Sequence, residues 1–218
     1  MLCRTCNKFT TFFRAWYICI MKTTFEIKIT EENLKTLRAV FSVHEAAKVG
    51  LTRLNLKRLT DAGMLLRLEN GIYRKESKNW DVSLDDFACA CLRFGKESYI
   101  GGLTALAFHQ LLNFSPRAIW VVTPSVKRST KHRLIRMTKK IPRDGVETIS
   151  GVVRIAGVER ALVDAFLFSG KVTLQHAFYA ARRAFADQKT TQEKLLSLAR
   201  SLNLENCILK HWEALQFE

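Results

Sequence analysis

Residues 51–63 read Leu-Thr-Arg-Leu-Asn-Leu-Lys-Arg-Leu-Thr-Asp-Ala-Gly, and this stretch decides the fold of the N-terminal part. Thr52 is a favoured N-cap residue and Gly63 a favoured residue just past a helix end, so we expect a helix between them. At 100° per residue, Leu56 and Leu59 share one face, which we expect to be buried. The side chains that point away from that face include Arg53, Lys57 and Arg58. The stretch therefore predicts a short helix with a cationic outer face.

Two more helices are expected upstream of this one. Thr30 begins a helical pattern over residues 30–40, with two carboxylates in the first turn that favour the positive end of the helix dipole. Ser42 and Glu45 have the spacing of a capping box, which predicts that a second helix starts at once. Gly50 is expected to end that helix.

A hairpin is expected downstream. Residues 64–68 alternate in polarity like a strand, Asn70-Gly71 suits a tight turn, and residues 72–75 return. Two helices, a cationic helix and a basic hairpin, in that order, predict a winged helix-turn-helix that binds double-stranded DNA, although winged helices also serve as protein–protein modules. The expected DNA-binding residues are Thr52, Arg53, Asn55, Lys57, Arg58, Arg67, Arg74 and Lys75.

The charge of the chain points to polyanionic partners. Lys and Arg number 35 against 20 Asp and Glu, a net charge of +15, so nucleic acid is the first expected partner and an acidic protein the second. Residues 117–143 hold nine basic side chains and no acidic one, more than solubility requires. We expect a secondary basic surface there, formed by Lys127, Arg128, Lys131 and Arg133.

The chain is expected to have an α+β fold in two domains. A polar break at residues 76–79 separates the winged helix-turn-helix, residues 22–78, from a mixed α+β domain, residues 79–218, with a helical tail. In the second domain we expect a helix capped by Ser83 that runs to Phe94 and another from Ile100 to Leu112. Short strands are expected at 119–123, 134–137, 147–149 and 152–155, and helices at about 158–169, 173–186, 191–202 and 206–215.

Residues 1–20 differ in composition from the rest of the chain, and we interpret them as an over-extended gene start or a loosely attached arm. Cys3, Cys6 and Cys19 are too few for a structural zinc site, and no His precedes His44. No metal or cofactor is expected. No apolar stretch has the length of a membrane span, so we expect a cytoplasmic protein that does not enter a membrane.

No pattern typical of catalysis is present in the sequence. There is no glycine-rich phosphate loop, no His-Glu-x-x-His helix and no Gly-x-Ser-x-Gly elbow. His109 is expected to pack in the fold rather than act as a base. Arg160 and Asp164, four residues apart on one helix, are expected to pair with each other, a contact worth only tenths of a kcal/mol if exposed. We therefore expect that the chain is not an enzyme.

Three ordered passages resemble the AbiEi-family antitoxins of type IV toxin–antitoxin, or abortive infection, systems. The first runs from Phe41 to Tyr73. The second, residues 99–111, is similar to the family pattern Ser-x-x-Ser-Ala-Leu-x-x-His-Gly-Leu, but Gln110 stands where the family has Gly. The third, residues 153–164, is similar to the family's strand followed by a Glu-Arg-x-Leu-x-Asp helix. The resemblance covers roughly residues 24–185.

The resemblance implies a two-part protein. Its winged helix would bind inverted repeats in its own promoter and repress transcription, and its C-terminal domain would neutralise a cognate nucleotidyltransferase-like toxin. Two alternatives stay open from the sequence. One is a nuclease or nucleotidyltransferase whose basic stretch, residues 117–143, holds nucleic acid, and the other is a regulator whose C-terminal domain senses a ligand.

Overall fold

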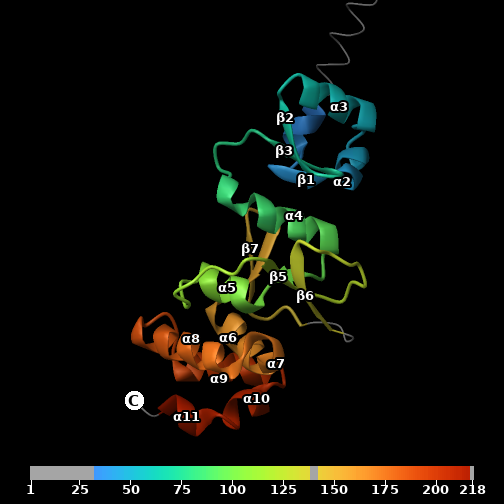
Figure 1. Cartoon of the computed structure of the whole chain (residues 1–218). Helices are drawn as coiled ribbons and strands as arrows, with labels where there is room; N and C mark the ends of the chain where they lie inside the picture. Colours follow the sequence, from blue (N-terminus) through green and yellow to red (C-terminus); the bar gives the residue numbers. More distant parts are fainter. Residues whose placement is uncertain (1–31, 138–141, 217–218) are drawn as a thin grey trace, which may run out of the picture. The chain divides into compact units, whose positions relative to one another are not determined.

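The computed structural model describes residues 32–137 and 142–216, and its fold is mixed α+β (Figure 1). The chain divides into two compact units, with the boundary between Lys78 and Asn79. The predictions made for residues 1–20, and for the cysteines within them, lie outside the described residues.

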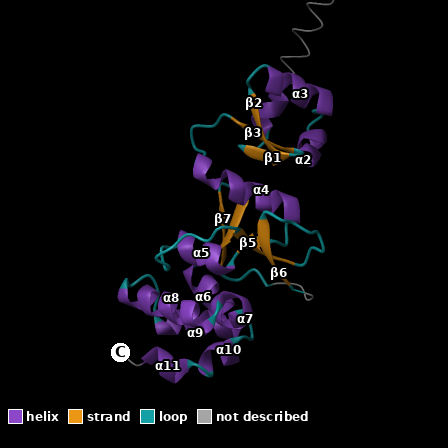
Figure 2. Ribbon diagram, viewed as in Figure 1, coloured by secondary structure: helices purple, strands orange, loops and turns teal. Residues whose placement is uncertain are grey.

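The first unit combines short helices with a three-stranded antiparallel sheet among its described residues (Figure 2). Residues 32–36 are helical. They are followed by β1 (Val40–Ser42), α2 (Val43–Lys48), α3 (Arg53–Asp61), β2 (Leu65–Glu69) and β3 (Ile72–Lys75). The sheet order is β1-β3-β2, so β3 lies between the two other strands.

The expected helix over residues 30–40 is wrong at its C-terminal end, because Val40 belongs to strand β1. Val40 pairs with Arg74, and the buried Phe41 ring stacks on Tyr73 with 6.2 Å between ring centroids. Pairing with a strand distant in sequence overrides the local helical pattern. The capping box at the start of α2 is confirmed, with Ser42 Oγ accepting from the Glu45 N–H and Glu45 Oε2 accepting from the Ser42 N–H.

The helix α3 and the hairpin β2–β3 form as expected. Leu56 and Leu59 are buried, and they belong to the apolar core of this unit. Gly63 follows α3 with φ +75, and Gly71 closes the hairpin with φ +77. Both are left-handed backbone conformations, which glycine adopts without strain because it has no Cβ atom. The core positions the opposite face of α3 toward solvent.

The second unit is built on a sheet of order β6-β5-β4-β8-β7. Its strands are β4 (Tyr99–Ile100), β5 (Ile119–Thr123), β6 (His132–Arg136), β7 (Val146–Ile149) and β8 (Val153–Ala156). β5 runs parallel to β6, and β4 runs parallel to β8, whereas the β4–β5 and β7–β8 pairs are antiparallel. In Figure 1 the strands lie between helix α4 (Asp85–Phe94) and a group of later helices.

Two helices of this unit differ from the sequence prediction. Ser83 does not cap α4, because a short 3₁₀ turn, η1 (Val82–Leu84), precedes it and Asp81 caps that turn. The second helix, α5 (Gly102–Phe108), is shorter than the predicted 100–112. Ile100 is held in the sheet between Val121 and Ile155, so the helix cannot begin there.

Three helices of the tail were predicted at nearly their observed positions, but the last predicted helix, 206–215, is two short helices, and the short helix Ser169–Val172 was not predicted. The tail comprises α6 (Val158–Leu167), α7 (Ser169–Val172), α8 (Leu174–Ala186), α9 (Gln192–Ser201), α10 (Glu205–Leu209) and α11 (Trp212–Gln216). Helix α6 is buried along most of its length and packs on α5, α8, α9 and α10. No helix within residues 32–137 and 142–216 combines the length and apolar character needed to cross a membrane.

Candidate nucleic-acid interface

The outer face of α3 is basic and accessible. Arg53, Lys57 and Arg58 are exposed, while Leu56 and Leu59 on the inner face are buried. Leu54, on the same outer side, is 57% exposed. The three basic side chains that the sequence placed on one face of a helix therefore do lie on one exposed face, together with one aliphatic side chain.

Thr52 and Asn55 together form the N-terminal cap of α3. Thr52 Oγ1 accepts from the Asn55 N–H at 3.2 Å, and Asn55 Oδ1 accepts from the Thr52 N–H at 3.3 Å and from the Thr52 hydroxyl. This is a capping box with Asn in the position that Glu or Gln usually holds. The cap uses Asn55 Oδ1, the side-chain amide oxygen. This is the atom that would accept a hydrogen bond from an adenine amino group.

The hairpin carries two more of the expected basic side chains, which differ in their exposure. Arg67 is exposed, and its guanidinium donates to Asn70 Oδ1 at 2.8 Å across the turn. Arg74 is half-buried on β3.

Lys75 is the exception among the basic residues expected at the interface. Its ammonium donates to the backbone carbonyls of Leu34 and Lys35 at 2.8 and 3.2 Å, at the end of the helical segment 32–36. Burial lowers the pKa of this lysine below its ordinary value. The structure therefore gives Lys75 an internal role, as a donor to backbone carbonyls at the C-terminal end of the first helix, and we omit it from the interface.

The secondary basic surface lies on the loop between β5 and β6 and on β6 itself. Lys127, Arg128, Lys131 and Arg133 are all exposed, as expected of residues after Pro124. Arg133 lies over the Trp120 ring, 5.8 Å from the ring centroid, and Lys127 Nζ donates to the Arg93 carbonyl at 2.8 Å. The sequence did not indicate that Arg93 and Lys171 lie beside this surface, because they come from distant helices.

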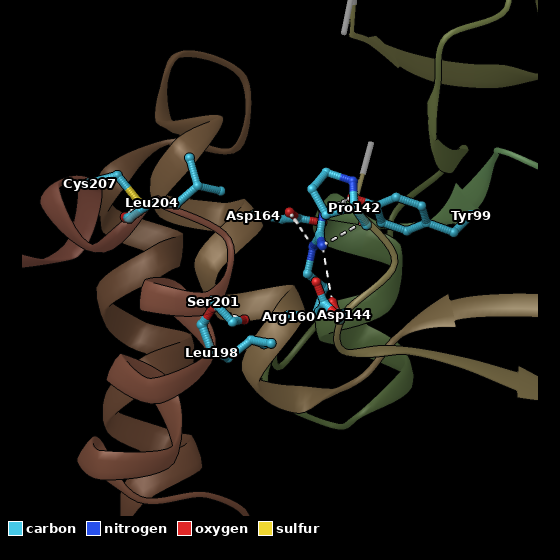
Figure 3. Close-up of polar contacts among 9 residues, drawn as sticks. All are labelled: Tyr99, Pro142, Asp144, Arg160, Asp164, Leu198, Ser201, Leu204 and Cys207. Carbon is cyan, nitrogen blue, oxygen red and sulfur yellow. Dashed lines mark hydrogen bonds and ion pairs between the residues drawn. The ribbon is translucent and has the colours of Figure 1, made fainter. Parts of the chain in front are cut away.

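A second notable group of polar residues is buried. Arg160 and Asp164 pair at 2.9 Å as expected, and their side chains are only 1% and 0% exposed, so the small energy of an exposed pair does not apply to them. The Arg160 guanidinium also donates to the Pro142 and Asp144 carbonyls at 3.0 and 3.1 Å, and to Tyr99 Oη at 2.7 Å (Figure 3). The Tyr99 hydroxyl in turn donates to Asp164 at 2.9 Å.

This buried network ties three parts of the second unit together: strand β4, the segment before β7 and helix α6. Burial, and then the negative charge of Asp164, raise the pKa of Tyr99 well above its ordinary value, so the phenol stays a donor. Every polar group of the network has partners within the protein, and no buried side-chain nitrogen or oxygen lacks one within the described ranges. The network is a closed structural clamp and presents no group to a substrate.

The remaining candidate for chemistry, His109, is also committed to the fold. Its Nε2 lies 2.7 Å from the Ala156 carbonyl oxygen, and the ring packs edge-on against Phe108. Cys89 and Cys91 are buried and form no disulfide, and burial raises the pKa of Cys91. Among the residues that the structure describes, no three His, Cys, Asp or Glu side chains are grouped as a metal site would require.

The chain was also compared with known proteins. No protein-family model and no curated protein matches the chain. Among solved structures, the chain is similar to the RV2827C protein from Mycobacterium tuberculosis, with 14% sequence identity and a TM-score of 0.48, over 84% of this chain and 77% of that protein.

Proposed function

We propose that the first unit is a winged helix-turn-helix that binds double-stranded DNA, with α3 in the major groove and the β2–β3 hairpin on flanking phosphates. The observation that carries the proposal is the division of α3 into two faces. Its inner face is fixed by Leu56 and Leu59, and its outer face holds three exposed basic side chains. A rigid, capped helix with donors on its exposed face suits recognition of base edges.

The roles of the individual side chains follow from their positions. Arg53 lies in the first turn of α3, which is the part of a recognition helix that reaches the base edges. Leu54, exposed beside it, is an apolar side chain of the kind that contacts a thymine methyl group. Arg67 and Arg74 on the hairpin are assigned to phosphates, which position the protein without reading sequence.

We further propose, from the resemblance to AbiEi-family antitoxins, that the chain represses its own promoter and neutralises a nucleotidyltransferase-like toxin. In this assignment the first unit binds the promoter and the second unit acts on the toxin. Lys127, Arg128 and Lys131 are exposed on the loop between β5 and β6, where their charge would speed the encounter with an acidic surface.

The DNA assignment is tested by measuring binding of the full chain to duplex fragments of its own promoter. Arg53→Ala is expected to weaken binding to the operator by roughly 1–3 kcal/mol and to relax base preference at one position. Lys194→Ala is the matched control, because Lys194 is an exposed lysine on α9. Equal losses for Arg53→Ala and Lys194→Ala would show that α3 is not the reading element.

The division of labour is tested in cells that carry the toxin gene and a promoter reporter. The full chain with Arg53→Ala and Lys57→Ala is expected to lose repression and to keep the rescue of growth. The chain with Lys127, Arg128 and Lys131 changed to Glu is expected to lose rescue or DNA affinity without unfolding. Loss of rescue in the α3 variant, with intact rescue in the loop variant, would reverse the assignment.

A further inference from the structure

A basic hollow of about 700 Å³ opens on the second unit. It lies among the end of α4, the loop before β6, β6 itself and α7. Its basic lining residues are Arg93, Arg128, Arg133, Arg136 and Lys171, and Ser129 and Thr130 add hydroxyl groups. None of the residues that line it in the described part of the chain is acidic.

The loop that forms one wall of the hollow is held in place by its own contacts. Arg136 donates to the carbonyls of Val126 and Lys127 at 3.4 and 3.3 Å. His132, only 8% exposed, lies with its Nδ1 2.8 Å from Ser129 Oγ and packs edge-on against Phe94. The loop that carries Arg128, Ser129 and Thr130 is therefore held before any ligand arrives, which lowers the backbone entropy lost on binding.

The chemistry of the hollow selects a multiply charged anion. Arginine and lysine side chains are donors without acceptor capacity, and the oxygens of phosphate groups are acceptors that arginine binds in a bidentate fashion. Several cations in one concave site also repel one another, and an anion between them removes that repulsion. A single phosphate carries roughly two negative charges, fewer than the cations present, whereas a chain of phosphates carries more.

We propose that this hollow binds the polyphosphate group of a nucleoside triphosphate. Its volume lies within the range of about 300–1,000 Å³ that is typical of small-molecule sites. A concave site of this size suits a compact anion better than the convex, regularly spaced backbone of a DNA duplex. The proposal uses residues of the second unit only, so it does not depend on DNA binding by the first unit.

Titration calorimetry of the full chain at physiological ionic strength tests the proposal, with ATP, inorganic tripolyphosphate and AMP as probes. ATP and tripolyphosphate are expected to bind at one saturable site with similar affinities, because the phosphates make the contacts. AMP is expected to bind at least about tenfold more weakly, since it lacks two phosphate groups.

Substitutions then locate the site. Arg128→Gln and Lys171→Gln remove charges from the lining without touching the contacts that hold the loop, and each is expected to weaken ATP binding about tenfold. Arg117→Gln is the matched control, because Arg117 is exposed in the same basic segment but does not line the hollow.

Four results would overturn the proposal. The first is the absence of saturable binding by ATP or tripolyphosphate, and the second is AMP binding as tightly as ATP. The third is an equal effect of Arg117→Gln and Arg128→Gln on ATP affinity. The fourth is that the hollow variants weaken duplex DNA binding while ATP does not bind at all. The last result would assign the hollow to DNA. Loss of DNA binding by the α3 variants alone would leave the nucleotide site intact, so the two proposals fail separately.

Discussion

Replacing Asp164 by Ala is expected to destabilise the second unit strongly. Asp164 is fully buried and accepts from the Arg160 guanidinium and the Tyr99 hydroxyl at 2.9 Å each. Its removal leaves a guanidinium that is 1% exposed without its counter-charge. Breaking a buried pair in this way costs about 3–5 kcal/mol. For a unit of this size the melting temperature is then expected to fall by roughly 10–15 °C.

The chain holds a matched control for this prediction. Arg183 on α8 and Asp187, the C-cap residue of that helix, are the same residue types at the same spacing, 3.5 Å apart, but their side chains are 39% and 42% exposed. Asp187→Ala is expected to change stability little, because water screens the pair and replaces the lost contact. The two substitutions differ in burial and not in the residue that is removed.

Urea unfolding followed by tryptophan fluorescence measures both effects. Trp80, Trp120 and Trp212 lie in the second unit, so the signal follows its unfolding. The double variant Arg160→Met with Asp164→Leu is expected to lose less stability than Asp164→Ala, since no buried charge is left unpaired. Equal losses for Asp164→Ala and Asp187→Ala would refute the reasoning.

Three further predictions concern single side chains. Tyr99→Phe is expected to reduce the loss of stability above pH 10. The raised pKa of Tyr99 keeps the folded phenol protonated, while the unfolded phenol, with an ordinary pKa of 10.0, ionises, so the free energy of unfolding of the unchanged chain falls by up to about 1.4 kcal/mol per pH unit. Urea unfolding of both chains from pH 9 to 11 measures the difference. Gln110→Gly is expected to raise the melting temperature. Gln110 is exposed just past α5 with φ +59, a left-handed backbone conformation that costs a residue with a Cβ atom about 1 kcal/mol of stability. An unchanged or lower melting temperature contradicts this. Lys75→Ala is expected to lower the free energy of unfolding by about 1–2 kcal/mol, measured by thermal unfolding, because the carbonyls lose a donor. Operator affinity, compared at equal concentrations of folded protein, is expected to change less than twofold. A large loss of affinity with intact stability would return Lys75 to the interface.

The parts of the fold that were predictable from sequence are those with local causes. The limits of α3 follow from Thr52 and Gly63, and the hairpin turn from Asn70 and Gly71, because caps and turns depend on a few adjacent residues. The strands β1 and β4 were missed. They are three and two residues long and exist only because distant strands pair with them.

The candidate sites show the same division. Arg53, Lys57 and Arg58 were correctly placed on one exposed helix face, because helical periodicity fixes which residues share a face. The internal role of Lys75 and the basic hollow of the second unit could not be predicted from the sequence, because both depend on contacts between distant segments. The burial of Arg160 with Asp164 was equally hidden, since this pair and the exposed pair at the end of α8 are identical in type and spacing.

The salt dependence of operator binding by the full chain tests the central claim most directly. The five basic side chains that we assign to the interface are Arg53, Lys57, Arg58, Arg67 and Arg74. Arg53 is assigned to a base edge, so at most the four other side chains neutralise phosphates. If each of the four neutralises one phosphate, the slope of log affinity against log salt concentration is expected to be about −3.6, and steeper if the second unit also contacts the duplex. Arg74→Ala is expected to make the slope less steep by about one. A slope close to zero, or one that Arg74→Ala leaves unchanged, would contradict the account.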